Sequence, residues 1–472
     1  MPAPRRSHIG HRPLVIAGTL LLQLIVATVF SRYLATKIAY EGLLYRGAGL
    51  GTMFACVVLG LAPATWMRLR LSRPSDGVIW MLYVLTIIPM SMMLPLNPAL
   101  TEGAAIKFVA IVVASFAVLT AVPFVGLSPL PRSAWLAHHG WNLLIVSGGL
   151  GLAMVIARFG VRLSLLSLAN VYDARLSFRT VAAGASPVFA YLIVWLQNLF
   201  GPLLFIGGLI RRSAVGVGLG VAAELWVYQT LGNRQALIAV AGCWVVWRLG
   251  RVRSERGPSV LLWGSIAIAL LSTGADLATG SFLSGYFLVR VLMLPSVLMA
   301  DYFSYFSLHA PVLLRDGLFS VLGRSPYATA TAYTIGFEFF QNPNTSANGN
   351  IWADGFANFG YIGMIAVPIV LAFIIWLLDN GTTRAAPGTV AGVLAVTVIS
   401  LANGGLQTIL VTNGFAPLIA FLVLTGGEVL APDHAVWFST FRRLAPARHQ
   451  IPVSRAARPA RPSLTSREIN TR

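Results

Sequence analysis

Five arginines lie where a membrane protein would not be expected to place a cation. Arg290 lies inside the apolar stretch 286–295, Arg234 lies in a very short turn between two apolar runs, and Arg315 lies farther along the same outer segment as Arg290. Arg175 and Arg179 follow a run that should end on the outer side. A guanidinium group binds phosphate oxygens through paired hydrogen bonds. The five side chains are therefore candidates for binding an anionic, diphosphate-containing substrate.

Bland explanations exist for the same arginines. Arg175 and Arg179 would be unremarkable if their loop were partly cytoplasmic, or if they contacted anionic lipid headgroups. Arg290 could extend to the membrane interface or pair with Asp301. A cation inside an apolar stretch usually faces a cavity or a partner, which favours the functional interpretation for Arg290.

A second set of residues has the chemistry to bind and activate a sugar. Tyr302 and Tyr305 could stack on sugar faces, although an aromatic belt at the membrane interface explains them equally well. Asn350 and Asn358 stand in a segment rich in Asn, Gly and Ser, whose amides match hydroxyl groups. A plain polar loop would have a similar composition.

Activation of an acceptor hydroxyl needs a base or an orienting acceptor. The candidates for this role are Asp354, His309, Asp301 and Glu338. The sequence does not choose among them. We take Arg290, Asp354 and His309 as the candidate catalytic residues.

The composition shows what kind of chain must position these residues. Hydrophobic residues make up 57% of 472 positions and charged residues 10%, against roughly 25% charged in soluble proteins. The chain therefore belongs in a lipid bilayer. The excess of 34 Lys and Arg over 15 Asp and Glu is then a topology signal in cytoplasmic loops rather than a nucleic-acid site.

Apolar runs long enough to cross a bilayer predict an all-α, polytopic fold with about 12 transmembrane helices. They lie at 14–31, 43–63, 77–94, 105–127, 142–158, 187–210, 214–231, 235–249, 258–272, 361–378, 388–406 and 413–431.

Clusters of arginine orient these runs. With both termini cytoplasmic, the arginine-rich loops fall on one side of the membrane. The predicted organisation is a cytoplasmic segment (1–13), helices 1–9 (14–272), a long extracytoplasmic loop (273–360), helices 10–12 (361–431) and a basic, disordered cytoplasmic tail (432–472). The apolar stretch 282–303 would be re-entrant, interfacial or one of a pair of extra crossings.

Signals for a metal or a cofactor are absent from the sequence. Cys56 and Cys243 lie in apolar runs away from any metal-ligand partner. The chain has no phosphate-binding Gly-x-x-x-x-Gly-Lys loop. We expect no metal and no cofactor.

Three blocks of the sequence resemble the O-antigen polymerase (Wzy-type) family of oligosaccharide repeat-unit polymerases. They are 171–175 with Arg179, then 290–295 followed by 301–307 and His309, and then 348–363, in which an acid precedes Asn358-Phe-Gly-Tyr-Ile-Gly363. The layout is similar over roughly 70–440.

The resemblance implies a membrane-embedded glycosyltransferase of the C type in the bacterial plasma (inner) membrane. Its substrate would be a polyprenyl-diphosphate-linked oligosaccharide, and its active site would face outward. Fixed guanidinium groups would stabilise the diphosphate leaving group without a metal. A chain-length regulator and a flippase would be partners only through this resemblance.

Other functions remain open. A ligase similar to the O-antigen ligases would use the same donor and would bind its diphosphate through arginines in the same way. A transporter or flippase would show paired broken helices near the membrane midplane. A polyprenyl-phosphate-sugar glycosyltransferase would show an acidic pair after its first span, where only Glu41 stands. The polymerase hypothesis predicts that Arg175 and Arg290 face one outer cavity together with Asp354.

Overall fold

The computed structural model describes residues 11–37, 43–161, 186–232, 234–252, 256–317, 320–321 and 323–432. Throughout these residues the regular structure is helical and no strand occurs. The principal helices are α1 (Arg12–Val29), α3 (Leu50–Trp66), α4 (Pro74–Leu82), α5 (Ile88–Leu96), α6 (Glu102–Ala121), α7 (Ala134–Phe159), α9 (Pro187–Trp195), α10 (Gly201–Arg211), α11 (Ala214–Leu231), α12 (Arg234–Val252), α13 (Gly257–Thr279), α14 (Leu294–Phe306), α15 (Thr331–Phe340), α16 (Ile351–Gly381), α17 (Pro387–Leu401), α18 (Leu406–Val411) and α19 (Phe415–Leu424).

The prediction of an all-helical, multi-pass membrane protein is confirmed. Among the described residues, nine helical segments are long and apolar enough to cross a bilayer. Three shorter apolar helices, α3, α17 and α19, accompany them. The α12 segment joins them in the bundle because it packs along most of α17.

Four of the long described segments contain a π-helix, and proline explains three of these π-helices. The π-helices η4 (Tyr83–Ile87), η6 (Leu196–Phe200) and η7 (Gly285–Met293) are followed by Pro89, Pro202 and Pro295. Proline cannot donate to the carbonyl four residues earlier, and its ring clashes with that group. In each case that carbonyl lies inside the π-helix, whose wider turn accommodates the proline.

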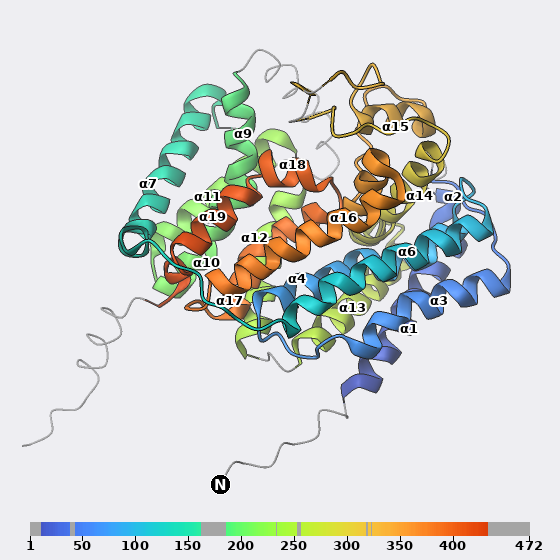
Figure 1. Ribbon diagram of the computed structural model, residues 1–472, viewed down its shortest axis with the longest axis horizontal. Helices are drawn as coiled ribbons and strands as arrows, with labels where there is room; N and C mark the ends of the chain where they lie inside the picture. The colour runs from blue at the N-terminus through green and yellow to red at the C-terminus, as the bar shows by residue number, and fades with distance from the viewer. Residues whose placement is uncertain are drawn as a thin grey trace, which may run out of the picture. The chain divides into compact units, whose positions relative to one another are not determined.

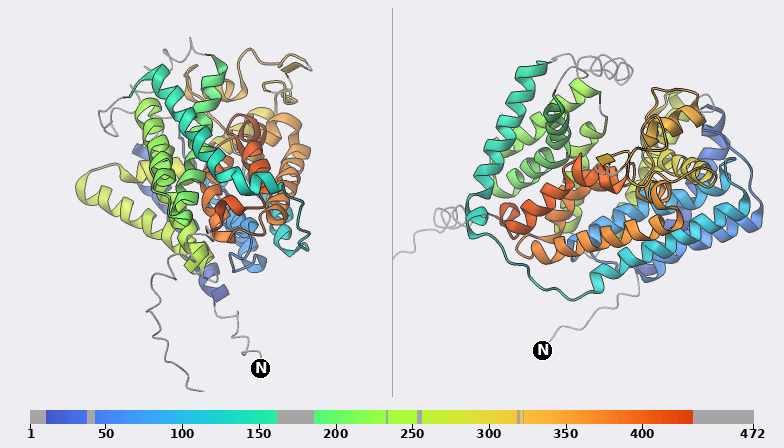
Figure 2. Two further views of the ribbon diagram at one scale, coloured as in Figure 1. Left: turned by 90° about the vertical axis from the view of Figure 1, so that its left-hand side faces the viewer. Right: turned by 45° about the horizontal axis from the view of Figure 1, so that its top comes forward.

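The helices form two groups that α16 to α19 join. Figures 1 and 2 show α7 and α9 to α11 on one side and α1, α3 and α6 on the other, with α16 to α19 between them. Helix α17 packs against α12, α10 and α4, while α16 packs against α6, α4 and α19. Close approach of α17 to α12 depends on Gly250 and Gly388, because a side chain on either would strike the backbone of the other.

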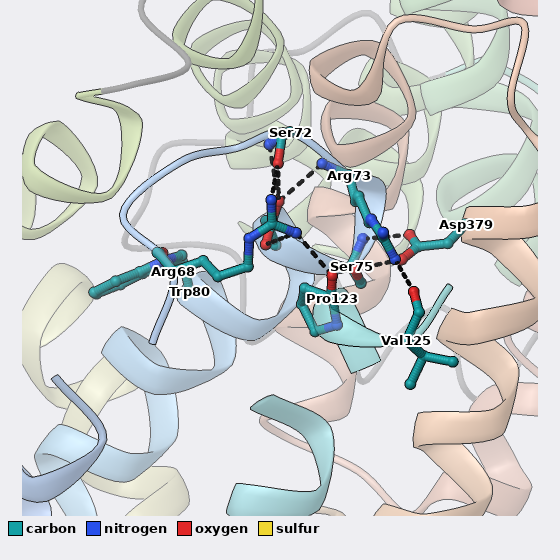
Figure 3. A network of polar contacts seen from close by, with 9 residues as sticks. Arg68, Ser72, Arg73, Ser75, Trp80, Pro123, Val125 and Asp379 are labelled. Atoms are coloured by element: carbon teal, nitrogen blue, oxygen red, sulfur yellow. Dashed lines mark hydrogen bonds and ion pairs between the residues drawn. The ribbon is translucent and has the colours of Figure 1, made fainter. Parts of the chain in front are cut away.

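Loops that carry arginine gather at one end of the bundle together with the segment 426–431, which binds several of them. We call this end the basic end, and it comprises 67–73, 125–133, 211–213, 382–386 and 426–431. Arg68 donates to the carbonyl of Pro123 at 2.8 Å, and Arg73 donates to that of Val125 at 2.6 Å (Figure 3). Arg132 and Arg384 both form ion pairs with Glu428. These contacts fix the loops to one another at one end of the bundle.

Buried polar contacts join the first and last thirds of the chain at this end. The backbone N–H of Ser75 donates to Asp379 Oδ1 at 2.9 Å, and the Ser75 hydroxyl donates to Asp379 Oδ2 at 2.6 Å (Figure 3). Asp76 accepts from the backbone N–H groups of Ser72 and Arg73 at 2.8 Å and so caps α4. The hydrogen bonds between Ser75 and Asp379 fix the start of α4 against the end of α16.

The segment 282–303 forms part of one continuous helix, η7 with α14, over Gly285–Phe306. Helix α13 starts at the basic end, where Gly257 contacts Leu71, and α16 finishes there. The chain from 280 to 350 therefore begins and ends at the opposite end. Within it α15 has 10 residues, too few to cross a hydrocarbon layer about 30 Å thick. This geometry favours the re-entrant or interfacial interpretation over an extra pair of crossings.

Helix α16 begins at Ile351, before the position 361 that the apolar pattern predicts. Asn350 caps it by accepting from the backbone N–H groups of Trp352 and Ala353, both at 3.1 Å. The helix then kinks at Phe359 and Gly360, where Gly360 has a φ of 59° that glycine adopts without strain. The residues between Asp354 and Asn358 thus lie on a short helical segment above the kink, not in a loop.

Candidate functional site

A polar cavity of about 220 Å³ lies at the end of the bundle opposite the basic end. We call this end the cavity end. Its walls come from the start of α16, the end of α14, the outer segments 312–317, 330–333 and 346–349, and the start of α18 with the residue before it. Two carboxylates, Asp316 and Asp354, and the amides of Asn348, Asn358 and Gln407 line it.

Asp354 occupies the first turn of α16 and is half-buried. Gly405 packs directly on its carboxylate, because a Cβ atom on Gly405 would lie 2.5 Å from Oδ2 and 2.6 Å from Oδ1. Asn358, one turn along, donates from Nδ2 to the Asp354 backbone carbonyl at 2.8 Å and to Oδ1 at 3.3 Å. Neither contact neutralises the carboxylate, which therefore presents acceptor atoms to the cavity.

Asn358 also holds the outer segment against α16. Its Oδ1 accepts from the backbone N–H of Leu314 at 2.6 Å, and the Ala357 carbonyl next to the kink accepts from Val312 at 2.9 Å. Leu313 and Leu314 have φ angles of 58° and 60°, a region that branched side chains rarely adopt. Such backbone strain persists only where surrounding contacts enforce it.

Asp316 is an anchor as well as a wall residue. One of its oxygens accepts from the backbone N–H of Thr331 at 2.6 Å and from the Thr331 hydroxyl. This contact fixes the start of α15 beside the cavity. Nearby, Tyr327 donates to the carbonyl of Ala310 at 2.5 Å. Burial raises the pKa of the Tyr327 phenol, and the neighbouring Tyr305 and Asp316 raise it further.

An aromatic cluster supports the cavity from below. The rings of Phe108 and Phe303 stack with centroids 4.1 Å apart, and Phe356 meets both rings at 5.2 Å. These three side chains come from α6, α14 and α16. Tyr302, one residue along from Phe303, donates to the carbonyl of Ala347 at 3.0 Å. The cavity therefore stands on packed rings, which limit its movement.

Three of the predicted sugar-binding or catalytic residues line the cavity: Tyr302, Asp354 and Asn358. Asn350 does not, since its side chain is fully buried as the cap of α16 and its Nδ2 meets Met299 Sδ at 3.4 Å. Tyr305 and His309 stack on each other with centroids 3.9 Å apart. His309 is exposed and is not a wall residue.

Arg290 and Arg315, two of the predicted phosphate-binding arginines, are not walls of this cavity. Arg290 is exposed on η7, and no ion pair joins it to Asp301, which instead accepts from Asn97 at 3.4 Å. Arg315 is half-buried and packs against Gly323. The backbone of Arg234 begins α12.

Arg175 and Arg179 lie outside the described residues. The predicted meeting of Arg175, Arg290 and Asp354 therefore stays a prediction for Arg175. For Arg290 the described cavity offers no direct contact.

Sequence reasoning missed two wall residues. Gly405 comes from the connection between α17 and α18, and Gln407 comes from the first turn of α18. The Gln407 Nε2 atom is buried without a hydrogen-bond partner. The signal was the polar run Asn403-Gly-Gly-Leu-Gln407 between two apolar runs. The role of Asp316 was missed too, since its partner Thr331 lies in a separate segment.

Comparison with protein-family models, with curated proteins and with solved structures finds no match for this chain. Fold and composition therefore define the class, a multi-pass helical membrane protein with a polar, carboxylate-lined cavity at one end of its bundle.

Proposed function

We propose that the chain is a membrane-embedded glycosyltransferase that polymerises oligosaccharide repeat units carried on polyprenyl diphosphate. The observation that carries the proposal is the cavity at Asp354, where a carboxylate faces amides and hydroxyls at the end of a membrane bundle. The sequence resemblance at 171–179, 290–309 and 348–363 supports the same activity. The proposal includes about twelve crossings, a C-type architecture, and a cavity facing outward from a bacterial plasma membrane.

The chemistry needs a base and a stabilised leaving group. An acceptor hydroxyl oxygen attacks the anomeric carbon of the donor, and the bond from that carbon to the diphosphate oxygen breaks. The hydroxyl proton passes to the Asp354 carboxylate, which is the only catalytic candidate of the three that lines the cavity. The diphosphate leaves with the electron pair of the broken bond.

The charge of the cavity supports separate proposed sites for the two substrates. Asp316 and Asp354 would repel a diphosphate, whereas carboxylates, amides and hydroxyls suit the hydroxyl groups of a sugar. The cavity is smaller than the roughly 300–1,000 Å³ clefts that enclose a larger ligand. We therefore assign it to the acceptor sugar, and the donor diphosphate to arginines outside it, with Arg234, Arg290 and Arg315 as candidates.

The decisive experiment incubates purified protein with the host's own polyprenyl-diphosphate oligosaccharide and then sizes the lipid-linked glycans. A ladder of repeats that disappears in Arg290→Ala is the expected result. Arg324→Ala is the matched control, because Arg324 is exposed in the same outer segment and does not line the cavity. An unchanged single repeat with the native donor would exclude polymerisation.

The same assay separates the polymerase from the ligase. A ligase would leave the single repeat unextended until a different acceptor is supplied. It would then transfer one glycan to that acceptor. A chain-length regulator and a flippase remain proposed partners. Addition of a co-purified regulator should alter the distribution of ladder lengths without creating activity in Arg290→Ala.

A further inference from the structure

Glu224 lies in the interior of the bundle with no partner for its charge. It belongs to α11, where its exposed fraction is 2%. Both carboxyl oxygens are buried and neither has a hydrogen-bond partner. The proposed transfer reaction does not use this residue. A carboxyl group kept in such a place is unusual, because an isolated buried charge is strongly destabilising.

The packing of α11 against α10 leaves room for this side chain at one position. Gly216, Gly220 and Glu224 follow each other at four-residue intervals and so share one face of α11. The two glycines pack against backbone or large side chains of the neighbouring helices. Glu224 instead meets Gly201, where a Cβ atom would lie under 3.0 Å from its Oε1 and 2.8 Å from the Leu196 carbonyl oxygen. Gly201 thereby creates the space that the carboxyl group fills.

No cation compensates the carboxyl group among the described neighbours. The elements packed against α11 are α7, α10, α12 and η6. Cys243 of α12, a buried thiol, is the titratable side chain of these elements that lies within electrostatic range of Glu224. Arg211 at the end of α10 donates instead to the carbonyls of Val429 and Glu428 at the basic end. Burial without a hydrogen-bond partner or a cation favours the protonated form of this carboxyl group.

The surroundings of Glu224 differ on its two sides. Toward the basic end the helices are closed, since a Cβ atom on Gly220 would lie 2.6 Å from the backbone nitrogen of Phe205, and one on Gly216 would lie 2.8 Å from the ring of Trp141. Toward the cavity end, η6, α17 and α12 carry polar side chains that bond to one another. Asn198 Oδ1 accepts from the Ser400 hydroxyl at 3.2 Å, and Gln235 Nε2 donates to that hydroxyl at 3.1 Å.

We propose that Glu224 is a proton-binding site inside the membrane bundle that exchanges its proton with the solution at the cavity end. The ligand is a proton rather than a metal ion, because the described residues place no group of three or more His, Cys, Asp or Glu side chains around the carboxyl group. The exchange path runs beside Asn198, Ser400 and Gln235. The inference rests on this packing and not on the proposed glycosyl transfer.

The test uses dicyclohexylcarbodiimide, an apolar reagent that modifies protonated carboxyl groups. The carboxyl proton moves to a carbodiimide nitrogen while the carboxyl oxygen bonds to the central carbon, and the acyl group then migrates to nitrogen as a stable adduct. Full-length protein in lipid nanodiscs is treated over a range of pH, and peptides are identified by mass spectrometry. Labelling of Glu224 should be at least ten-fold stronger at low than at high pH, and unchanged by added Na⁺.

Two variants control for access and folding. Glu224→Gln should lose the adduct and keep the thermal midpoint of the wild type, because an amide has the shape of the protonated acid. Gly201→Ala should reduce labelling, whereas Gly218→Ala should not, since a Cβ atom on Gly218 meets nothing within 4 Å. Infrared difference spectra of wild type against Glu224→Gln record the protonated carboxyl directly, even where the reagent does not enter.

The side of exchange is measured in sealed vesicles with different pH inside and outside. An exposed cysteine introduced as Ala328→Cys and treated with an impermeant maleimide reports which way the cavity end faces. Labelling of Glu224 should follow the pH on that side. Protection of Glu224 from the reagent by Na⁺ would indicate a metal-ion site and so overturn the proposal. Labelling that follows the pH at the basic end would also overturn it, as would the absence of both the adduct and the infrared signal.

Discussion

Replacing Asp354 with asparagine is the sharpest test of the proposed base, because the structure shows how the fold would tolerate the change. Asn358 cannot rotate freely, since its Oδ1 accepts from Leu314 at 2.6 Å. Its Nδ2 therefore keeps facing residue 354. In Asp354→Asn the amide oxygen can accept from that Nδ2, and the amide nitrogen takes the place of the other carboxylate oxygen. The hydrogen bond survives and the basic atom is lost.

The expected effect on rate follows from the role of a general base. Removal of such a group typically costs a factor of 10²–10⁴, or about 2.7–5.4 kcal/mol of transition-state stabilisation at 1.36 kcal/mol for each tenfold. The thermal midpoint should not fall, because one of two like charges in the cavity is removed and no hydrogen bond is broken.

Initial rates of repeat addition are measured with native donor, and unfolding is followed by the intrinsic tryptophan fluorescence of detergent-solubilised protein. Asp316→Asn is the matched control, since it removes the same charge from the same cavity while keeping an acceptor for Thr331. It should retain a rate within about ten-fold of wild type, a loss smaller than that expected for a base.

Two results would refute this reasoning. If Asp354→Asn polymerises at the wild-type rate, the carboxylate is not the base, and the stacked His309 outside the cavity becomes the first candidate. If Asp354→Asn instead unfolds at a lower temperature than Asp316→Asn, then the carboxylate supports the fold, and the rate loss says nothing about catalysis.

Three further substitutions test the packing around the site and at the basic end. Gly405→Ala should displace the candidate base and lower the rate of repeat addition at least ten-fold, whereas Gly404→Ala, with no neighbour closer than 3.4 Å, should leave it unchanged; equal rates for both would contradict the contact. Phe108→Ala should lower the free energy of unfolding by about 3–5 kcal/mol, because the buried Phe108 ring joins three helices. Denaturant titration measures this change, and a loss below about 1 kcal/mol would refute that role. Ser75→Ala should lower the free energy of unfolding by about 1–3 kcal/mol in the same titration, because it leaves Asp379 Oδ2 without its donor. The folded protein that remains should still polymerise at the wild-type rate. A loss of rate without a loss of stability would contradict this and show that the basic end is coupled to the cavity.

Much of the helical layout could be predicted from hydropathy, because the hydrocarbon thickness imposes a length on each apolar run. The run 187–210 matches the continuous helix Pro187–Arg211 almost to the residue. The start of α16 was placed too late because 351–360 carries polar residues. Those polar residues face a cavity, and a hydropathy pattern does not distinguish such a helical segment from a loop. A cap signal was available, since Asn350 precedes Ile351 and an acid follows in the first turn.

The candidate site was harder to predict, because its walls come from segments far apart in sequence. Asp354 was found through its local motif, but its neighbour Gly405 belongs to a different connection. Arg290 was expected in a cavity because of its apolar surroundings. The π-helix that carries it changes which residues share a helical face, so a pattern based on 3.6 residues per turn cannot give its direction.

The burial of α4 and α5 has a consequence for how the protein is made. In an 18-residue apolar window of Pro74–Leu96, 94% of the residues are buried. Helices α16 and α17, which cover this segment, are synthesised after it has entered the membrane. Asp379 reaches Ser75 across 304 positions of sequence. At about 5–20 residues per second, the ribosome takes roughly 15–60 s to supply that partner. During this interval the early helices need temporary cover from lipid or an insertion factor, and a chain that stops before α16 leaves that face permanently open to degradation.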